Sequence, residues 1–269
     1  MDASTHTPGP VRDKRDPLRP LRYAYRIPLL LVHVLLGIAL CGIVLTLFGG
    51  KVMHKGREPF AHRTIRWWST GLLRIFGFRA RRIGTPLNDP TLFVCNHSSW
   101  LDIELMHTQR AACFVAKAEI ARWPVVGWMA ARGGTIFHRR GSNHSLAAVM
   151  QVMVDRMRGG RSVAVFPEGG TSSGADLRVF HARILQAAID AESPIQPVAL
   201  RYARGGKRWL DVAFRPRESF LSNVIRLMGE PTLDAEVHFL KPVPVHPDGR
   251  KRMAEQARAQ IAQALEDPA

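Results

Sequence analysis

The sequence contains few cysteines and few acidic residues. Its three cysteines, Cys41, Cys95 and Cys113, are far apart, and no CxxC pair occurs in the 269 residues. This usage suits a reducing cytoplasm and argues against a disulfide framework or a structural zinc site. Internal repeats, low-complexity tracts and nucleic-acid-binding motifs are also absent. We therefore expect one globular domain and no nucleic-acid partner.

Positive charge greatly exceeds negative charge. The 38 lysines and arginines outnumber the 22 aspartates and glutamates, which gives a formal net charge of +16. A surface of this sign attracts polyanions, among them anionic lipid headgroups and phosphorylated small molecules. Charge alone does not choose between these partners.

The N-terminal part of the chain has the composition of a membrane-attachment region. Residues 1–26 are rich in Arg and Pro and lack apolar periodicity, which predicts a basic, mobile tail. Residues 27–48 form an apolar run without a formal charge, interrupted only by His33. At about 1.5 Å per residue, a helix of this length reaches across roughly the hydrocarbon core of a bilayer. A cleaved signal peptide is disfavoured, because the run is too long and has no small-x-small cleavage site.

Residues 60–78 have the pattern of a basic amphipathic helix, with Ile65 and Leu72 on one face. Trp67 and Trp68 favour a position at the membrane interface, and the alternative is a surface helix packed on the globular core. Both flanks of the apolar run are basic, so the positive-inside rule gives no orientation. A helical hairpin dipping into one leaflet would place both basic flanks on the same side. We assign residues 27–78 to a membrane anchor with an interfacial helix.

Residues 79–269 alternate short apolar runs with helical patterns, which predicts an α/β fold with a mostly parallel sheet flanked by helices. This domain would follow the N-terminal membrane-associating helical segment. The predicted strands are TLFVCN (91–96), CFVA (113–116), GTIF (134–137), SVAVF (162–166), PIQPVAL (194–200), WLDVAF (209–214) and AEVHFL (235–240). The predicted helices cover residues 100–108, 142–158 and 249–265.

The segment NHSSWLD carries the clearest chemical signal. His97 follows a predicted strand, at the end where open α/β sheets bind ligands, and a helix then begins. Asp102 comes five residues later, a little over one helical turn away, so its carboxylate can hold one imidazole nitrogen while the other acts as a general base. No protein nucleophile is required if His97 deprotonates the hydroxyl of an acceptor that then attacks an acyl thioester directly.

Four ordered segments resemble the motifs of the glycerolipid acyltransferase family, which includes bacterial 1-acylglycerol-3-phosphate acyltransferases. They are NHSSWLD (96–102), GTIFHRRG (134–141), FPEGGTSSG (166–174) and PIQPVALRY (194–202), and KAEIARWPVVGW (117–128) is also similar. The resemblance covers roughly residues 90–202. It implies that His97 is the base and that Asp102 orients it.

The resemblance further implies a site for the acceptor's headgroup and glycerol region, formed by Arg140, Glu168, Gly169, Gly170, Thr171 and Ser172. The residues themselves agree in kind. A guanidinium such as that of Arg140 suits phosphate, and two glycines at a strand end allow backbone N–H groups to approach an anion. The alternatives are a solvated arginine and, for Glu168, an ordinary exposed carboxylate.

Two departures from the family's pattern concern the acceptor. The third motif commonly reads FPEGTRS, and this chain lacks that arginine. In this stretch it is more similar to the lyso-ornithine lipid acyltransferases. In contrast, Arg139 replaces an acidic residue and adds positive charge near the expected headgroup site. We expect 1-acylglycerol-3-phosphate as the acceptor, with phosphatidic acid as the product, and keep lyso-ornithine lipid as the alternative.

Three other classes of function remain as alternatives. A serine hydrolase would use Ser172 in GTSSG, with Asp211 or Asp234 and then His238 or His246. A non-enzymatic protein would only bind membranes. A metal enzyme would need further ligands beyond His97 and Asp102, for which His138 and His181 are candidates by residue type alone.

The expected protein is thus an acyltransferase at the inner membrane whose catalytic domain faces the cytoplasm. Its partners would be the bilayer, a lysolipid acceptor and a donor, either acyl-CoA or acyl-carrier protein. We expect no metal and no bound cofactor, because the thioester is a co-substrate.

Overall fold

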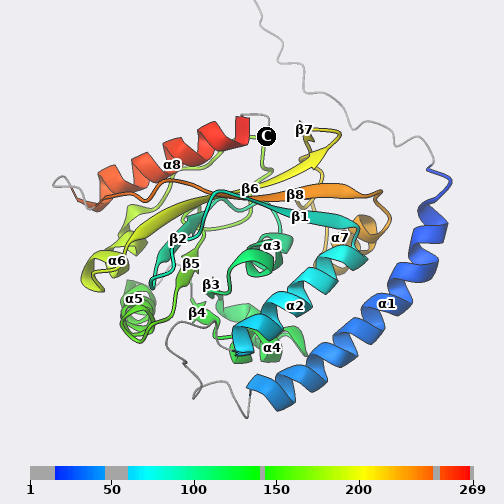
Figure 1. Cartoon of the computed structure of the whole chain (residues 1–269), viewed down its shortest axis with the longest axis horizontal. Helices are drawn as coiled ribbons and strands as arrows, with labels where there is room; N and C mark the ends of the chain where they lie inside the picture. The colour runs from blue at the N-terminus through cyan, green and yellow to red at the C-terminus, as the bar shows by residue number, and fades with distance from the viewer. Residues whose placement is uncertain (1–15, 46–59, 140–142, 245–248, 267–269) are drawn as a thin grey trace, which may run out of the picture.

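The computed structural model describes residues 16–45, 60–139, 143–244 and 249–266 (Figure 1). The α-helices are α1 (Arg19–Leu40), α2 (Phe60–Ile75), α3 (Leu101–Gln109), α4 (Val126–Arg132), α5 (Asn143–Arg158), α6 (Gln186–Asp190), α7 (Phe220–Met228) and α8 (Arg250–Glu266). A π-helical turn, η1 (Cys41–Leu45), and two 3₁₀ helices, η2 (Ala118–Arg122) and η3 (Ala182–Leu185), complete the described helical segments. The strands are β1 (Phe78–Ile83), β2 (Leu92–Cys95), β3 (Cys113–Lys117), β4 (Ile136–His138), β5 (Val163–Val165), β6 (Ile195–Arg204), β7 (Lys207–Arg208) and β8 (Leu233–Phe239).

The described strands form one mixed sheet in the order β1-β8-β6-β2-β5-β3-β4, and β7 pairs with β6. Strand β2 lies between β5 and β6 and is parallel to both. Antiparallel pairing occurs where β6 meets β8 and β7. The expected α/β fold with a mostly parallel, helix-flanked sheet is confirmed, and the carboxyl end of β2 lies in the middle of the sheet.

Helices cover both faces of the sheet, because the strands are apolar on both sides. In β2, Phe93 and Cys95 face a core shared with α2, α3 and α7, whereas Leu92 and Val94 face a core shared with α5, α6 and α8. Figure 1 shows α3 and α2 on one side of the twisted sheet and α8 on the other. The two cores hold β2 firmly at the point where the NHSSWLD segment begins.

The structure differs from the sequence predictions at residues 209–214, at β1 and at the end of α2. Residues 209–214 form no strand: Trp209 N still donates to Tyr202 O of β6 at 2.7 Å, but the chain then turns, with Ala213 N donating to Leu210 O. The edge strand β1 went unpredicted because three of its six residues are arginines. The helix expected to continue to residue 78 ends at Ile75, because Gly77 adopts a left-handed φ of 84° and turns the chain into β1.

The predicted tail is wrong over its last residues, because α1 already begins at Arg19. Arginine side chains explain why this stretch is ordered. Arg22 Nη1 donates to Gly229 O at 2.8 Å, and Arg26 Nη1 donates to Met228 O at 2.8 Å and Glu230 O at 2.7 Å. These carbonyls lie at and just after the end of α7, where a helix leaves acceptors without partners. Residues 1–15 of the predicted tail lie outside the described residues.

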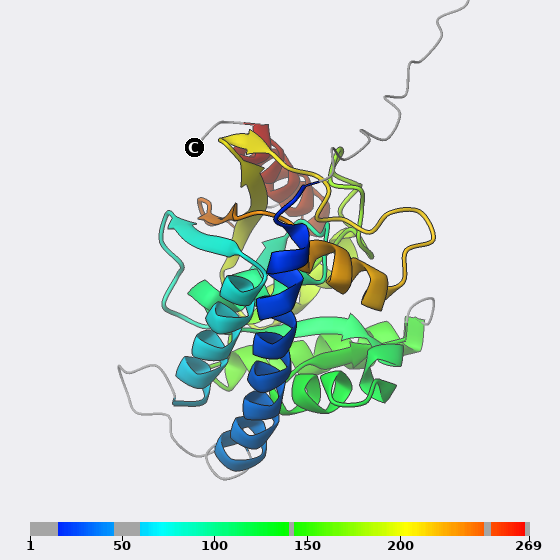
Figure 2. The same cartoon turned by 90° about the vertical axis from the view of Figure 1, so that its right-hand side faces the viewer.

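Helix α1 packs lengthwise on α2 (Figure 2), an arrangement that agrees with the expected hairpin. His33 Nε2 lies 2.9 Å from Trp68 O, and the two rings stack with centroids 5.2 Å apart. Gly71 permits this approach, because a Cβ there would lie 2.6 Å from the His33 ring. The connection between the helices, residues 46–59, lies outside the described residues.

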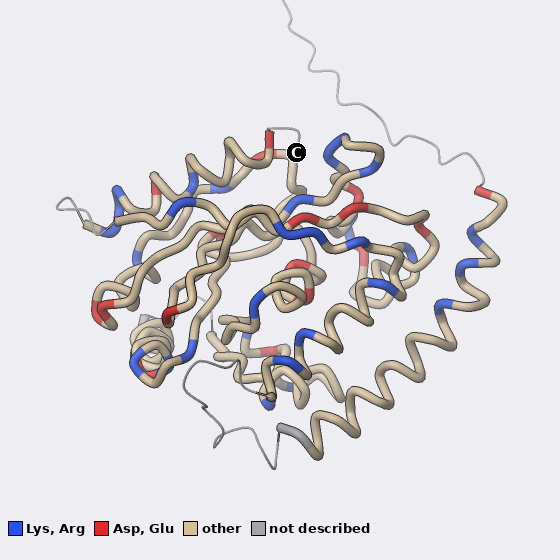
Figure 3. Tube along the Cα trace, viewed as in Figure 1, with Lys and Arg blue, Asp and Glu red and all other residues tan. Residues whose placement is uncertain are grey.

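The rest of α1 presents an apolar face to the surroundings. Beyond Arg26 the helix has no charged residue, as Figure 3 shows. Val32 and Leu35 are more than 60% exposed, and α1 with the start of η1 is long and apolar enough to cross a membrane. Helix α2 fits both interpretations weighed from the sequence, since Leu72 and Leu73 are buried in the core and Trp67 is exposed. This apolar face indicates membrane association.

Candidate active site

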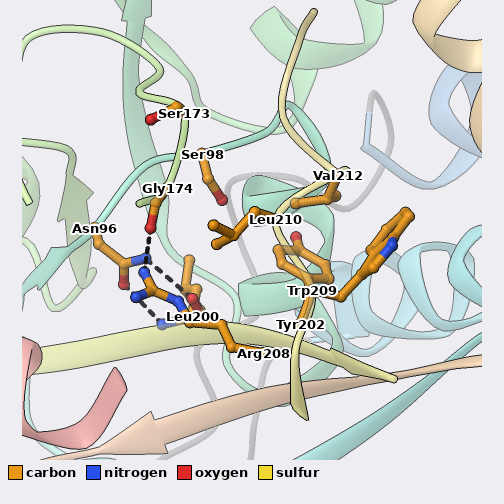
Figure 4. A pocket seen from close by; sticks show the side chains of 10 residues that line it. All are labelled: Asn96, Ser98, Ser173, Gly174, Leu200, Tyr202, Arg208, Trp209, Leu210 and Val212. Carbon is orange, nitrogen blue, oxygen red and sulfur yellow. Dashed lines mark hydrogen bonds between the residues drawn. The ribbon is translucent and has the colours of Figure 1, made fainter. Parts of the chain in front are cut away.

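The NHSSWLD segment runs from the loop after β2 into the first turn of α3, and its first residue fixes the loop to β6. The Asn96 amide donates to Leu200 O at 3.0 Å, and Leu200 N donates to Asn96 Oδ1 at 2.8 Å. The side chain thus continues the pairing of β2 with β6 beyond the end of the strand (Figure 4). His97, the next residue, is held at the carboxyl end of the sheet.

His97 and Asp102 lie side by side, as the sequence predicts. The distance from His97 Nδ1 to Asp102 Oδ2 is 2.9 Å. The same oxygen accepts from the backbone N–H groups of Ser98 at 2.7 Å and Ser99 at 2.8 Å. Asp102 is fully buried in the first turn of α3, with its carboxylate held by these hydrogen bonds. The pair has the geometry of a general base with its orienting carboxylate, and those roles stay a prediction.

The imidazole of His97 is also held from one side. Its ring stacks on Phe166, with centroids 3.9 Å apart and planes 11° from parallel. Phe166 stacks in turn on Phe114 of β3 at 5.4 Å. The His97 side chain is 13% exposed, so it is shielded but still reachable.

Glu168 connects this loop to the segment that follows β5. Its Oε1 accepts from His97 N at 2.7 Å, and its Oε2 accepts from Arg178 N at 3.2 Å. The residue is only 4% exposed, and this burial raises the pKa of its carboxyl group. The alternative of an ordinary exposed carboxylate is therefore wrong. Both oxygens are engaged in positioning backbone, and a direct contact with the acceptor stays a prediction.

The glycine-rich stretch after Glu168 is bonded to the backbone of His97 through Ser172. Ser172 N donates to His97 O at 2.9 Å, and Ser172 Oγ donates to the same oxygen at 3.2 Å. Gly169 adopts a left-handed φ of 74°, and its N–H donates to Phe166 O at 3.2 Å to close a turn. The sequence suggested that this N–H would bind an anion, but it is already used in the turn. Gly170 and Thr171 are partly exposed beside this turn.

Other predicted residues lie elsewhere. Arg140 is outside the described residues, and the adjacent Arg139 is exposed. His238, a candidate member of a hydrolase triad, places Nε2 3.0 Å from Glu236 Oε2, whereas the Ser172 hydroxyl donates to His97 O. His246 is outside the described residues. Among the described residues, no three or more His, Cys, Asp or Glu side chains are grouped as metal ligands would be.

Two contacts of the site were not anticipated from the sequence. The Tyr202 hydroxyl donates to Asp102 Oδ1 at 2.8 Å, and the Arg208 guanidinium donates to Gly174 O (Figure 4). A signal for Tyr202 exists in the alternation of β6, since Val198, Leu200 and Tyr202 point to one face of the strand. Arg208 lies beyond the four motifs, in a two-residue strand that no apolar pattern marks.

Comparisons with known proteins agree with this geometry. A family model described as Acyltransferase matches residues 79–201. A lyso-ornithine lipid O-acyltransferase of Pseudomonas aeruginosa is 35% identical over 207 residues, which cover 77% of this chain and 80% of that protein. The chain belongs to the acyltransferase family. It is therefore an acyltransferase, and the enzyme class inferred from its four motifs is confirmed.

Two further similarities refine the picture of this acyltransferase. A 1-acyl-sn-glycerol-3-phosphate acyltransferase of Neisseria gonorrhoeae is 41% identical over 111 residues, which cover 41% of this chain and 44% of that protein. The crystal structure of the 1-acyl-sn-glycerophosphate acyltransferase PlsC from Thermotoga maritima shares the fold, with a TM-score of 0.59 and 18% identity, over 93% of this chain and 99% of that one.

Proposed function

We propose that the enzyme transfers a fatty acyl group from an acyl thioester to the free hydroxyl of a lysolipid, with His97 as general base. One observation carries the proposal: Asp102 Oδ2 lies 2.9 Å from His97 Nδ1. This contact engages Nδ1 and leaves Nε2 to take a proton from the substrate. General-base catalysis of this kind contributes about 10² to 10⁴-fold to a rate.

The reaction needs no protein nucleophile. Nε2 of His97 takes the hydroxyl proton as the acceptor oxygen attacks the thioester carbonyl carbon. The tetrahedral intermediate then expels the thiolate, which recovers the proton from the imidazolium to give a free thiol. Asp102 stabilises the imidazolium between these two steps. The donor is acyl-CoA or acyl-carrier protein, and this scheme uses no bound cofactor.

The acceptor's polar part would lie against the stretch after β5. Glu168 shapes this surface by fixing the backbone of His97 and Arg178. Gly169, Gly170 and Thr171 are at least partly exposed beside His97, and Ser172 packs this segment against it. We propose that the exposed part receives the glycerol region and that Arg140 receives an anionic headgroup.

Two acceptors are supported by different observations. The four motifs and the 41% identity to the Neisseria enzyme support 1-acylglycerol-3-phosphate. The Pseudomonas enzyme matches almost twice as many residues, and its name supports lyso-ornithine lipid. The FPEGGTSSG stretch agrees with the second candidate, because it lacks an arginine. Both acceptors present a hydroxyl beside an acyl chain, so the chemistry at His97 is the same.

We further propose that the enzyme lies on the cytoplasmic face of the inner membrane. The exposed apolar face of α1 supports attachment. Between α1 and α2 lies an open, mainly apolar groove of about 380 Å³, lined by Leu36, Leu40, Phe60, Arg63, Thr64 and Trp67. A groove of this kind suits the acyl chains of a membrane lipid, with the anionic headgroup of that lipid near Arg63.

The test is a product assay with the purified full-length protein. Labelled acyl-CoA and labelled acyl-carrier protein are each offered with 1-acylglycerol-3-phosphate, with lyso-ornithine lipid, and with a lysolipid analogue in which hydrogen replaces the free hydroxyl. We expect labelled diacyl lipid from at least one lysolipid and none from the analogue. Release of free fatty acid alone would contradict acyl transfer.

A further inference from the structure

The Asp102 carboxylate is held by donors on both oxygens, and they come from different parts of the fold. Oδ2 receives His97 and two backbone N–H groups from its own loop. Oδ1 receives the hydroxyl of Tyr202 at 2.8 Å, from strand β6, one hundred residues away in the chain. Without a donor on Oδ1, the buried carboxylate would be held through one oxygen only.

Tyr202 is itself fixed on several sides. It is 2% exposed, and its ring meets Phe78 of β1 edge to face with centroids 5.6 Å apart. The Asn96 side chain bonds the loop between β2 and α3 to the backbone of Leu200, two residues before Tyr202. The distance between the tyrosine hydroxyl and the loop is therefore set by strand pairing.

The hydroxyl donates at every working pH. Burial, together with the neighbouring Asp102 carboxylate, raises the pKa of Tyr202 well above its usual range, so the phenol stays protonated. The titratable groups around the His97–Asp102 pair are Tyr202 on β6, Glu168 after β5 and Cys95 at the end of β2. Burial raises the pKa of Cys95 as well, which keeps this thiol neutral.

We propose that Tyr202 is a positioning residue of the reaction, whose hydroxyl fixes the orientation of the Asp102 carboxylate and so the orientation of His97. This role rests on the proposed function of His97 as base. Two physical effects follow. The hydroxyl prevents the carboxylate from rotating away from the imidazole, and it withdraws negative charge from the carboxylate, which limits how strongly Asp102 favours a protonated His97.

The test is Tyr202→Phe, which keeps the buried ring and removes only the oxygen. We expect kcat to fall roughly tenfold, the value for one lost hydrogen bond to a charged group, with the acceptor KM within about twofold. We also expect the pKa of His97 to be higher in the variant than in the wild type, because Asp102 then presents more negative charge to the imidazole. Histidine NMR titration measures this shift directly, with the His97 signal assigned from its loss in His97→Gln.

Tyr25→Phe is the matched control, because it also removes a hydrogen-bonded tyrosine oxygen, one that accepts from Arg26 Nε at 3.2 Å on α1 and makes no bond to His97 or Asp102. It should leave kcat and the His97 pKa unchanged. A purely structural role for Tyr202 predicts a lower melting temperature with an unmoved His97 pKa, and that result would overturn the proposal. An unchanged kcat would do the same. If the wild-type protein transfers no acyl group, the proposed function fails, while the NMR titration still tests the contact between Tyr202 and the pair.

Discussion

Two loops meet at the candidate site, and they are built differently. The loop from Asn96 to Asp102 is short and buried, and its side chains and N–H groups bond to β6 and to one carboxylate. The segment from Pro167 to His181 is longer and more exposed, and it touches the first loop mainly through Glu168 and Ser172. A fixed loop suits proton transfer, whereas a looser one suits recognition of an acceptor that differs between related enzymes. The following substitutions test this division.

Asp102→Asn should have the largest effect. The asparagine amide would donate to His97 Nδ1, which leaves Nε2 protonated and unable to act as a base, and it would also face the N–H donors of Ser98 and Ser99. We expect kcat to fall roughly 10³-fold. Steady-state kinetics measures this loss, with Asp155→Asn on the exposed face of α5 as the control. An Asp102→Asn enzyme that keeps a tenth of its activity would contradict the role of the first loop.

Glu168→Gln should have an intermediate effect, because it weakens the connection between the loops. A glutamine can accept from only one of the N–H groups of His97 and Arg178, and its own amide then faces the other donor. We expect kcat to fall about tenfold and the melting temperature to fall by a few degrees. Glu255→Gln, on the exposed side of α8, is the control for both measurements. Unchanged kcat and melting temperature would show that the loops do not depend on this contact.

Gly169→Ala should act mainly on the acceptor. The φ of 74° disfavours an L-residue by about 1 kcal/mol, which corresponds to roughly 2–4 °C in melting temperature for a chain of this size. Gly205→Ala is a matched control, because Gly205 has a φ of 58° in the β6–β7 turn with no atom near its missing Cβ. Both variants should lose similar stability, but only Gly169→Ala should raise the acceptor KM. Equal KM values would remove this turn from acceptor binding.

Ser172→Ala should have the smallest effect. It removes both bonds of the hydroxyl, one to His97 O and one from Gly174 N, but leaves the backbone bond from Ser172 N to His97 O. We expect kcat within about threefold of wild type, because this backbone bond still holds the segment against His97. Ser173→Ala, at the exposed neighbouring position, is the control. Complete inactivation by Ser172→Ala would instead favour a serine hydrolase.

Much of this arrangement could be predicted from the sequence, because local patterns specify it. The apolar runs around Leu92–Cys95 and Val163–Val165 predicted the central strands, and the spacing of His97 and Asp102 predicted their contact. Both signals come from residues close together in the chain.

The missed features depend on contacts between distant residues. Val212 and Ala213 are buried by packing against distant parts of the chain, although they belong to no strand, and three arginines in β1 break its apolar pattern. The ordering of Arg22 and Arg26 comes from carbonyls after α7, about 200 residues later. The contact of Tyr202 with Asp102 likewise requires knowing which strands are neighbours.

The central claim is that His97 removes the proton from the acceptor hydroxyl. The most direct test measures transfer of labelled acyl groups to lysolipid by wild-type enzyme and by His97→Ala in the same membranes, at matched protein levels. We predict labelled diacyl lipid from the wild type and a loss of at least about 10³-fold in the variant. Equal rates of transfer by both proteins would contradict the claim.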